Sequence, residues 1–208
     1  MVSFQKQIMR VKDRFLKKQN NIFLFAIFFC LAVFSNNSNS NEIAFKIENY
    51  IKKLDFFSSK FIQSNGMSLE EGDIFINNKK IRLDYFKPHR TLIISKKKGV
   101  YINHELKEES FFSNESNIVH LFYDIFLDNN FYLSMKQKEV NGGVIFEKDL
   151  DIDSVKSNIK ILFENNPLLL RKIIISNESE KITVSFSGHK YNNTFDDNLF
   201  SFVPMYLD

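Results

Sequence analysis

Large apolar residues at every second position mark many short segments of the chain after residue 56. Two clear examples are the pair Ile74 and Ile76, and the set Ile81, Leu83 and Tyr85. This period of two is that of a β-strand with one buried face. Gly, Asn, Pro and Ser residues, which favour turns, separate the segments at short intervals. Intervals this short allow hairpins but no crossover helices, so the pattern predicts an antiparallel sheet.

Two segments, residues 42–55 and 116–129, instead place apolar residues at helical spacing. Strand patterns resume after the second helix, over residues 132–138, 144–146, 159–163, 168–175, 182–186 and 199–202. The sum is about ten strands with two or three helices, and a twisted sheet of that size must curl or split. We therefore predict a mainly β (α+β) fold in which a curved antiparallel sheet is closed by a helical lid.

The start of the chain has the order of a secretory signal peptide. Residues 1–19 carry six basic residues and one acidic residue, residues 22–34 are wholly apolar, and residues 35–41 are polar. This order predicts a signal peptide over residues 1–35, a polar linker over 36–41 and a single domain over 42–208. Met9 is a second candidate start. An uncleaved membrane anchor is the alternative, although the apolar run is shorter than the roughly 20 residues that span a bilayer.

Removal of this leader changes the charge of the chain. The whole sequence has a formal charge of +3, but residues 36–208 hold 22 basic and 24 acidic residues. The basic balance therefore gives no support to a nucleic-acid partner.

The sequence carries no recognisable catalytic or metal-binding motif. The four histidines, His89, His104, His120 and His189, are scattered, and none has a second ligand at metal spacing. There is no G-x-S-x-G elbow and no Gly-rich phosphate loop. The only cysteine, Cys30, lies in the apolar run of the leader, and the bulky residues before it argue against lipid modification. We expect no enzyme activity, no cofactor and no metal, with a hydrolase on a β-rich scaffold as the disfavoured alternative.

Strand parity and helical spacing each give one apolar face, and we predict that these faces meet across an apolar cavity. The strand residues expected on its concave side are Ile74, Ile76, Ile81, Leu83, Tyr85, Ile182, Val184 and Phe186. The helix residues expected to close over it are Ile47, Ile51, Leu54, Leu121 and Phe126.

An ordered series of motifs resembles the LolA family of outer-membrane lipoprotein carrier proteins. The first half contains Phe-x-x-x-Phe-x-Gln at residues 57–63, Gly-x-Ile-x-Ile at 72–76 and Ile-Arg-Leu-x-Tyr-x-x-Pro at 81–88, followed by strand patterns at 92–95 and 100–102. The second half agrees at residues 166–170, 182–186, 191–193 and 200–204. The resemblance extends from Glu42 to Pro204, nearly the whole predicted domain.

The resemblance implies an incomplete (half) barrel of about ten to eleven strands whose cavity binds the acyl chains of lipoproteins. It implies a monomeric periplasmic chaperone for lipoprotein localization. Such a chaperone receives its cargo from an inner-membrane ABC transporter and delivers it to an outer-membrane acceptor, LolB or an equivalent. The alternative is a related lipid-binding or envelope-stress sensor module of the same fold, which an uncleaved leader would tether to the membrane.

The sequence departs from the family pattern at the lid latch. The family usually has an Arg-Pro pair whose arginine latches the lid through hydrogen bonds to helix carbonyls. Here that region reads Asn-Asn-Lys-Lys, and Lys79 and Arg82 are the candidate latch residues. Leu83 stands where the family has Trp. The basic cluster of Lys96, Lys97 and Lys98 replaces an Asp-Gly turn, and is either a solvated hairpin tip or an electrostatic handle for an acidic partner or anionic headgroups.

Overall fold

The computed structural model describes residues 38–113, 117–128, 130–196 and 198–202. The predicted signal peptide lies outside these residues. The chain divides into two units, Met1–Ile43 and Ala44–Asp208, and the second unit contains every described strand.

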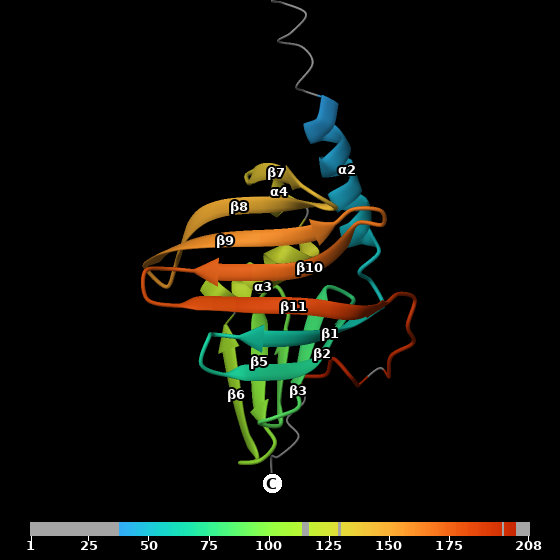
Figure 1. Ribbon diagram of the computed structural model, residues 1–208. Helices are drawn as coiled ribbons and strands as arrows, with labels where there is room; N and C mark the ends of the chain where they lie inside the picture. The colour runs from blue at the N-terminus through green and yellow to red at the C-terminus, as the bar shows by residue number, and fades with distance from the viewer. Residues whose placement is uncertain (1–37, 114–116, 129, 197, 203–208) are drawn as a thin grey trace, which may run out of the picture. The chain divides into compact units, whose positions relative to one another are not determined.

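Eleven strands form one antiparallel sheet in the second unit (Figure 1). They are β1 (Phe57–Ser64), β2 (Leu69–Asn77), β3 (Lys80–Tyr85), β4 (Arg90–Ile94), β5 (Lys98–Asn103), β6 (Glu108–Ser113), β7 (Lys136–Val140), β8 (Gly143–Ile152), β9 (Val155–Glu164), β10 (Leu169–Ser176) and β11 (Lys181–Lys190). Their order is β6-β5-β4-β3-β2-β1-β11-β10-β9-β8-β7. Two runs of hairpins, β1 to β6 and β7 to β11, therefore meet where β1 pairs with β11. The predicted mainly β, antiparallel fold is confirmed.

The sheet is strongly bent and stays open between its edge strands, β6 and β7. In Figure 1, β8 to β11 and β1 run across the view, whereas β3, β5 and β6 run down it. A sheet that bends so strongly without closing is an incomplete barrel, as predicted.

Three helices accompany the sheet: α2 (Ser38–Lys52), α3 (Asn117–Leu127) and α4 (Asn130–Leu133). α2 begins inside the segment predicted as a polar linker, which is rich in the Ser and Asn residues that favour helix starts. α3 and α4 form the connection between the two edge strands, and we call them the lid. Among the described helices, none has the length and apolar character that crossing a bilayer requires.

One predicted strand starts too early and another is wrong. Tyr132 lies in α4, and the strand that follows begins only at Lys136, because a single helical turn is too short to show a helical period. Residues 199–202 are not a strand, although Leu199, Phe200 and Phe202 match the strand pattern. They belong to a segment, residues 191–196 and 198–202, that we call the outer segment because it packs on the convex face of the sheet.

The outer segment covers the convex face of β2 to β5 with aromatic rings. The Phe195 ring lies 5.9 Å from that of Phe75 on β2 and 5.7 Å from that of Phe200. Phe202 packs against a small core formed by Ile93, Val100 and Ile102. This part of the sheet is therefore buried on both faces.

Candidate functional site

The eight predicted strand residues lie on one face of the sheet. Ile74 pairs with Leu83, and Ile76 pairs with Ile81, across β2 and β3. The same face continues through Phe61, which stands opposite Gly72 on one side and Phe186 on the other. Six of the eight are buried (Ile74, Ile76, Ile81, Leu83, Val184 and Phe186), whereas Tyr85 and Ile182 are partly exposed. Arg82 and Asp84 point to the opposite face, since they alternate with Ile81 and Leu83 along β3.

The helices cover this concave face, which we call the inner face. The Phe126 ring of α3 meets Phe186 of β11 edge-on, with 5.6 Å between ring centroids. Tyr50 of α2 makes the same kind of contact with Phe163 of β9 at 5.3 Å. Of the five residues predicted on helices, Ile47, Leu121 and Phe126 are buried and Ile51 is half-buried. Leu54 is also buried, but it lies in the turn after α2, because the helix ends at Lys52.

α3 and α4 are joined to each other by a buried hydrogen bond. The Tyr132 hydroxyl donates to the Ile125 carbonyl oxygen at 2.7 Å. Burial raises the pKa of Tyr132, so the hydroxyl stays protonated and remains a donor. The Tyr132 ring also contacts Phe146 and Phe163 of the inner face. Because of this bond, we expect the two lid helices to move together.

The sequence prediction left out several large side chains of the inner face. Phe61, Phe163, Ile94, Ile161 and Ile173 are each at most 2% exposed and belong to it. The signal was present, because each continues the period of two of its own strand.

The two candidate latch residues lie away from the inner face. Arg82 binds the Asp84 carboxylate with its Nε at 2.9 Å and the Leu199 carbonyl oxygen with its Nη1 at 2.7 Å. Lys79 is exposed in the turn between β2 and β3. Within the part of the chain that the structure describes, the hydrogen bonds of Arg82 fasten the outer segment rather than a helix. The latch role of both residues stays a prediction.

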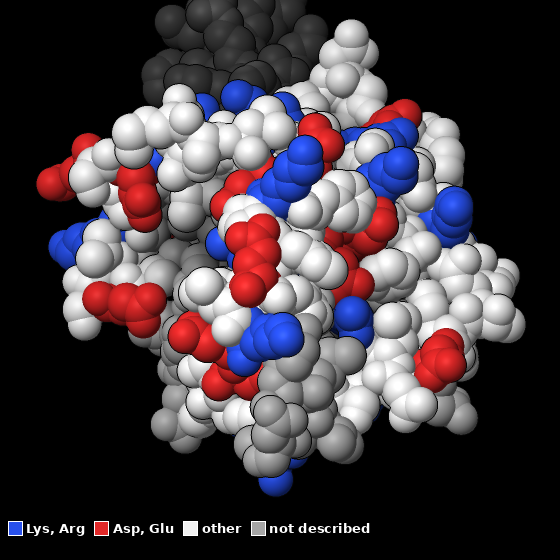
Figure 2. Space-filling view, turned by 90° about the horizontal axis from the view of Figure 1, so that it is seen from below, with Lys and Arg blue, Asp and Glu red and all other residues white. Residues whose placement is uncertain are grey.

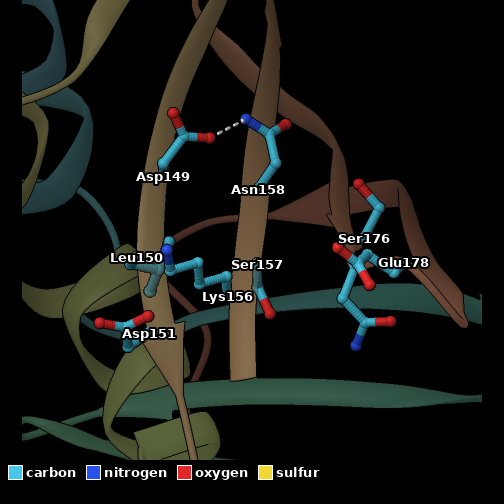
Figure 3. A pocket seen from close by; sticks show the side chains of 9 residues that line it. Asp149, Leu150, Asp151, Lys156, Ser157, Asn158, Ser176 and Glu178 are labelled. Carbon is cyan, nitrogen blue, oxygen red and sulfur yellow. Dashed lines mark hydrogen bonds between the residues drawn. The ribbon is translucent and has the colours of Figure 1, made fainter. Parts of the chain in front are cut away.

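A pocket of about 690 Å³ lies at the tips of the β8–β9 and β10–β11 hairpins (Figure 3). Eight of the nine residues that line it have polar or charged side chains, and they include three carboxylates, from Asp149, Asp151 and Glu178, against one ammonium from Lys156. Asn158 donates to Asp149 across it at 2.7 Å. Such a lining does not suit an acyl chain, so the inner face is the better candidate site. Among the described residues there is no cluster of three or more His, Cys, Asp or Glu side chains that could hold a metal.

The fold and the site together define an open half-barrel with an apolar inner face and a helical lid. The family model described as "Outer membrane lipoprotein carrier protein LolA" matches residues 52–203. The chain belongs to the LolA family.

Individual relatives are distant. An uncharacterized protein of Rickettsia prowazekii (strain Madrid E) is 23% identical over 186 residues, which cover 87% of this chain and 86% of that protein. An uncharacterized conserved protein from Thermus thermophilus superposes with a TM-score of 0.54 at 9% identity, covering 81% of this chain and 97% of the other, and so shares the fold. A putative outer membrane lipoprotein-sorting protein domain from Vibrio parahaemolyticus gives a TM-score of 0.43 at 12% identity, covering 74% and 94% of the two chains.

Proposed function

We propose that this protein is a periplasmic carrier that shields the acyl chains of lipoproteins between its inner face and its helices. It collects them from an inner-membrane ABC transporter and delivers them to an acceptor at the outer membrane, LolB or an equivalent. The protein works as a monomer and catalyses no reaction itself. The observation that carries this proposal is the continuous apolar inner face, from Phe163 through Phe186 to Ile81, which is covered by helices instead of a second sheet.

The position of the lid in the chain supports this proposal. α3 and α4 connect the two edge strands, and their ring contacts with the sheet are apolar. None of the strand pairs depends on them, because the sheet is held by its own hydrogen bonds. The lid can therefore leave the inner face while every strand keeps its partners, and the space it leaves is lined by apolar side chains.

The energetics of release require such a lid. Burial of one CH₂ group is worth about 0.8 kcal/mol, so a dozen in one chain give roughly 10 kcal/mol. Two or three chains bound that well would reach or exceed the ~18–21 kcal/mol limit of non-covalent binding, and the cargo would not leave. A lid whose own side chains bury the inner face in the empty state offsets much of this energy. The carrier then exchanges one apolar contact for another, and release becomes feasible.

The first test of the carrier function uses two Glu substitutions on neighbouring parts of the sheet. Leu83 lies on the inner face and is 5% exposed, whereas Ile62 lies on the convex face of β1 and is 42% exposed. We expect Leu83→Glu to abolish binding of a fluorescent acyl probe while the thermal melt shows a folded domain, because an opening cavity admits water to the charge. Ile62→Glu should leave binding intact. Loss of folding in Leu83→Glu would indicate an ordinary packed core, and unchanged binding would remove Leu83 from the site.

A second test concerns export. We propose that residues 1–35 are removed, so that sequencing of the mature terminus gives a start near Asn36. A protein that retains Met1 or Met9 would instead favour the membrane-tethered sensor module of the same fold.

A further inference from the structure

The apolar inner face ends in a polar row on four adjacent strands. Along β1 to β4, the inner positions are filled by Phe, Ile and Leu over most of their length. The last inner position of each strand, at the end that carries the β1–β2 and β3–β4 turns, is polar instead. These residues are Gln63, Glu70, Tyr85 and Arg90, and the register pairs Gln63 with Glu70 and Tyr85 with Arg90. Sequence parity found only Tyr85 among them.

The four side chains contact one another. The Arg90 Nη2 donates to the Glu70 carboxylate at 2.5 Å, and the guanidinium carbon lies 4.3 Å from the centre of the Tyr85 ring. The Tyr85 hydroxyl donates to the Gln63 amide oxygen at 3.3 Å. Burial raises the pKa of Tyr85, so the hydroxyl stays protonated. The Arg90 and Glu70 side chains are 23% and 21% exposed, so a ligand can reach them.

The row adjoins the apolar part of the inner face without a gap. The Phe61 ring meets the Tyr85 ring edge-on at 5.0 Å, above Gly72. A Cβ at Gly72 would come within 2.2 Å of the Asp84 carbonyl oxygen and 2.7 Å of the Phe61 ring, so only glycine leaves room for this contact. An acyl chain lying on Leu83 and Phe61 would thus have its end beside Tyr85 and Arg90.

Hydrogen-bonding capacity remains in the row. A guanidinium has five N–H donors, and among the described residues Arg90 uses one of them, toward Glu70. The Gln63 amide accepts from Tyr85, and its NH₂ group donates to no side chain or carbonyl in the described part of the chain. On the other half of the sheet, the corresponding inner positions of β9, β10 and β11 stay apolar, with Ile159, Ile175 and Ile182. The unused donors of the row therefore lie on one side of the inner face.

The charges in the polar row determine which ligand groups can bind there. Arg90 and Glu70 neutralise each other, and a carboxylate or phosphate would approach the Glu70 carboxylate as well as Arg90. The face of the molecule seen in Figure 2 is mixed in the same way, with basic and acidic side chains interspersed over it. Uncharged acceptors that need donors match the row better than anions do.

We propose that this polar row is a subsite for the ester and amide carbonyl groups by which acyl chains are attached to a polypeptide. Arg90 and Gln63 donate to these carbonyl oxygens, while the chains lie on the apolar part of the inner face. The subsite rests on the proposed carrier function and adds to it a means of distinguishing chains attached through ester or amide carbonyl groups from free fatty acid and from chains without any carbonyl group.

The test compares three probes on one double variant. Glu70→Leu combined with Arg90→Met removes both charges together, so no unpaired charge stays behind. The probes are a dipalmitoylglyceryl-cysteine peptide, dipalmitoylglycerol, and a pyrene-labelled alkane without any carbonyl group. We expect the double variant to bind the peptide at least about ten-fold more weakly, as the loss of a hydrogen bond from a charged donor implies. Its affinity for the alkane should stay within about two-fold of the unchanged protein.

The matched control is Glu164→Leu with Arg171→Met, which removes a second ion pair with the same 2.5 Å separation that is 45% and 36% exposed. It should change the affinity for neither the peptide nor the alkane.

Gln63→Leu leaves the Arg90–Glu70 pair intact and should selectively weaken peptide binding, which keeps the test valid if the double variant is unstable in a thermal melt. Equal losses for peptide and alkane, or no loss for the peptide, would overturn the subsite. The subsite would also be overturned if the unchanged protein binds dipalmitoylglycerol but not the peptide. Failure of the unchanged protein to bind any of the three probes would instead refute the carrier function.

Discussion

Replacement of Phe126 by alanine distinguishes a displaceable lid from an ordinary packed core. Phe126 is 1% exposed, and its ring meets Phe186 on the inner face. Truncation of a buried Phe to Ala costs about 3–5 kcal/mol. In a packed core, all of this energy is lost from the stability of the fold. In a carrier, much of it is lost from the closed state of the lid alone, because the sheet keeps its hydrogen bonds.

The two cases differ in the sign of the effect on binding. A loss of about 3 kcal/mol from the closed state raises the ratio of open to closed lid roughly 100-fold. The apparent dissociation constant equals the intrinsic one divided by the open fraction, so the affinity rises until the open state predominates. We therefore expect Phe126→Ala to bind an acyl probe more tightly, by about 10- to 100-fold.

The assay is a fluorescence titration of the acyl probe beside urea denaturation. Phe61→Ala is the control, because it removes the same ring from the sheet itself, at a position that is 2% exposed. The control should lose stability without gaining affinity. The lid argument is refuted if Phe126→Ala loses stability and its affinity stays unchanged or falls. It is also refuted if Phe61→Ala gains as much affinity, since a newly created cavity would then explain both results.

Three further outcomes are expected. Gly72→Ala should lower the melting temperature by the equivalent of about 1–3 kcal/mol, because the new methyl group overlaps the Asp84 carbonyl oxygen and the Phe61 ring, and calorimetry measures this. Replacement of the exposed Lys96 and Lys97 by Ser should slow transfer to anionic vesicles at low salt but not at high salt; equal rates at low salt would reject the electrostatic handle. Burial lowers the pKa of His189, whose Nε2 lies 2.9 Å from the Leu170 carbonyl oxygen, so the folded state resists protonation. The unfolded chain takes up the proton first, and stability should fall as the pH drops below about 6.5, an effect that urea denaturation should find reduced in His189→Gln.

Strand parity predicted the inner face because a period of two needs no knowledge of which strands pair. Ile74, Ile76 and Leu83 were placed on one face from their own strands alone, and the register agrees. The polar row could not be found in this way. Glu70 and Arg90 are 20 residues apart and meet only because β2, β3 and β4 are adjacent in a particular register.

The outer segment shows that a strand-like pattern of apolar residues can occur without a strand. Alternation of Leu199, Phe200, Ser201 and Phe202 resembles a strand, yet the segment makes no ladder and buries rings on the convex face. A pattern of alternate apolar residues reports burial of one side, and burial on another element satisfies it as well as strand pairing does.

The pairing of β1 with β11 determines how the domain must assemble. Every other strand pair joins neighbours in sequence, so the two hairpin runs can form from local contacts. The β1–β11 pair brings together residues such as Ser59 and Ser187, whose hydroxyl and carbonyl groups are 2.8 Å apart across the sheet. Contacts of such long sequence separation form slowly, because the intervening chain must first be brought together. Until this central pair forms, each run exposes its half of the apolar face, so the nascent chain is most vulnerable to aggregation just before its last strand arrives.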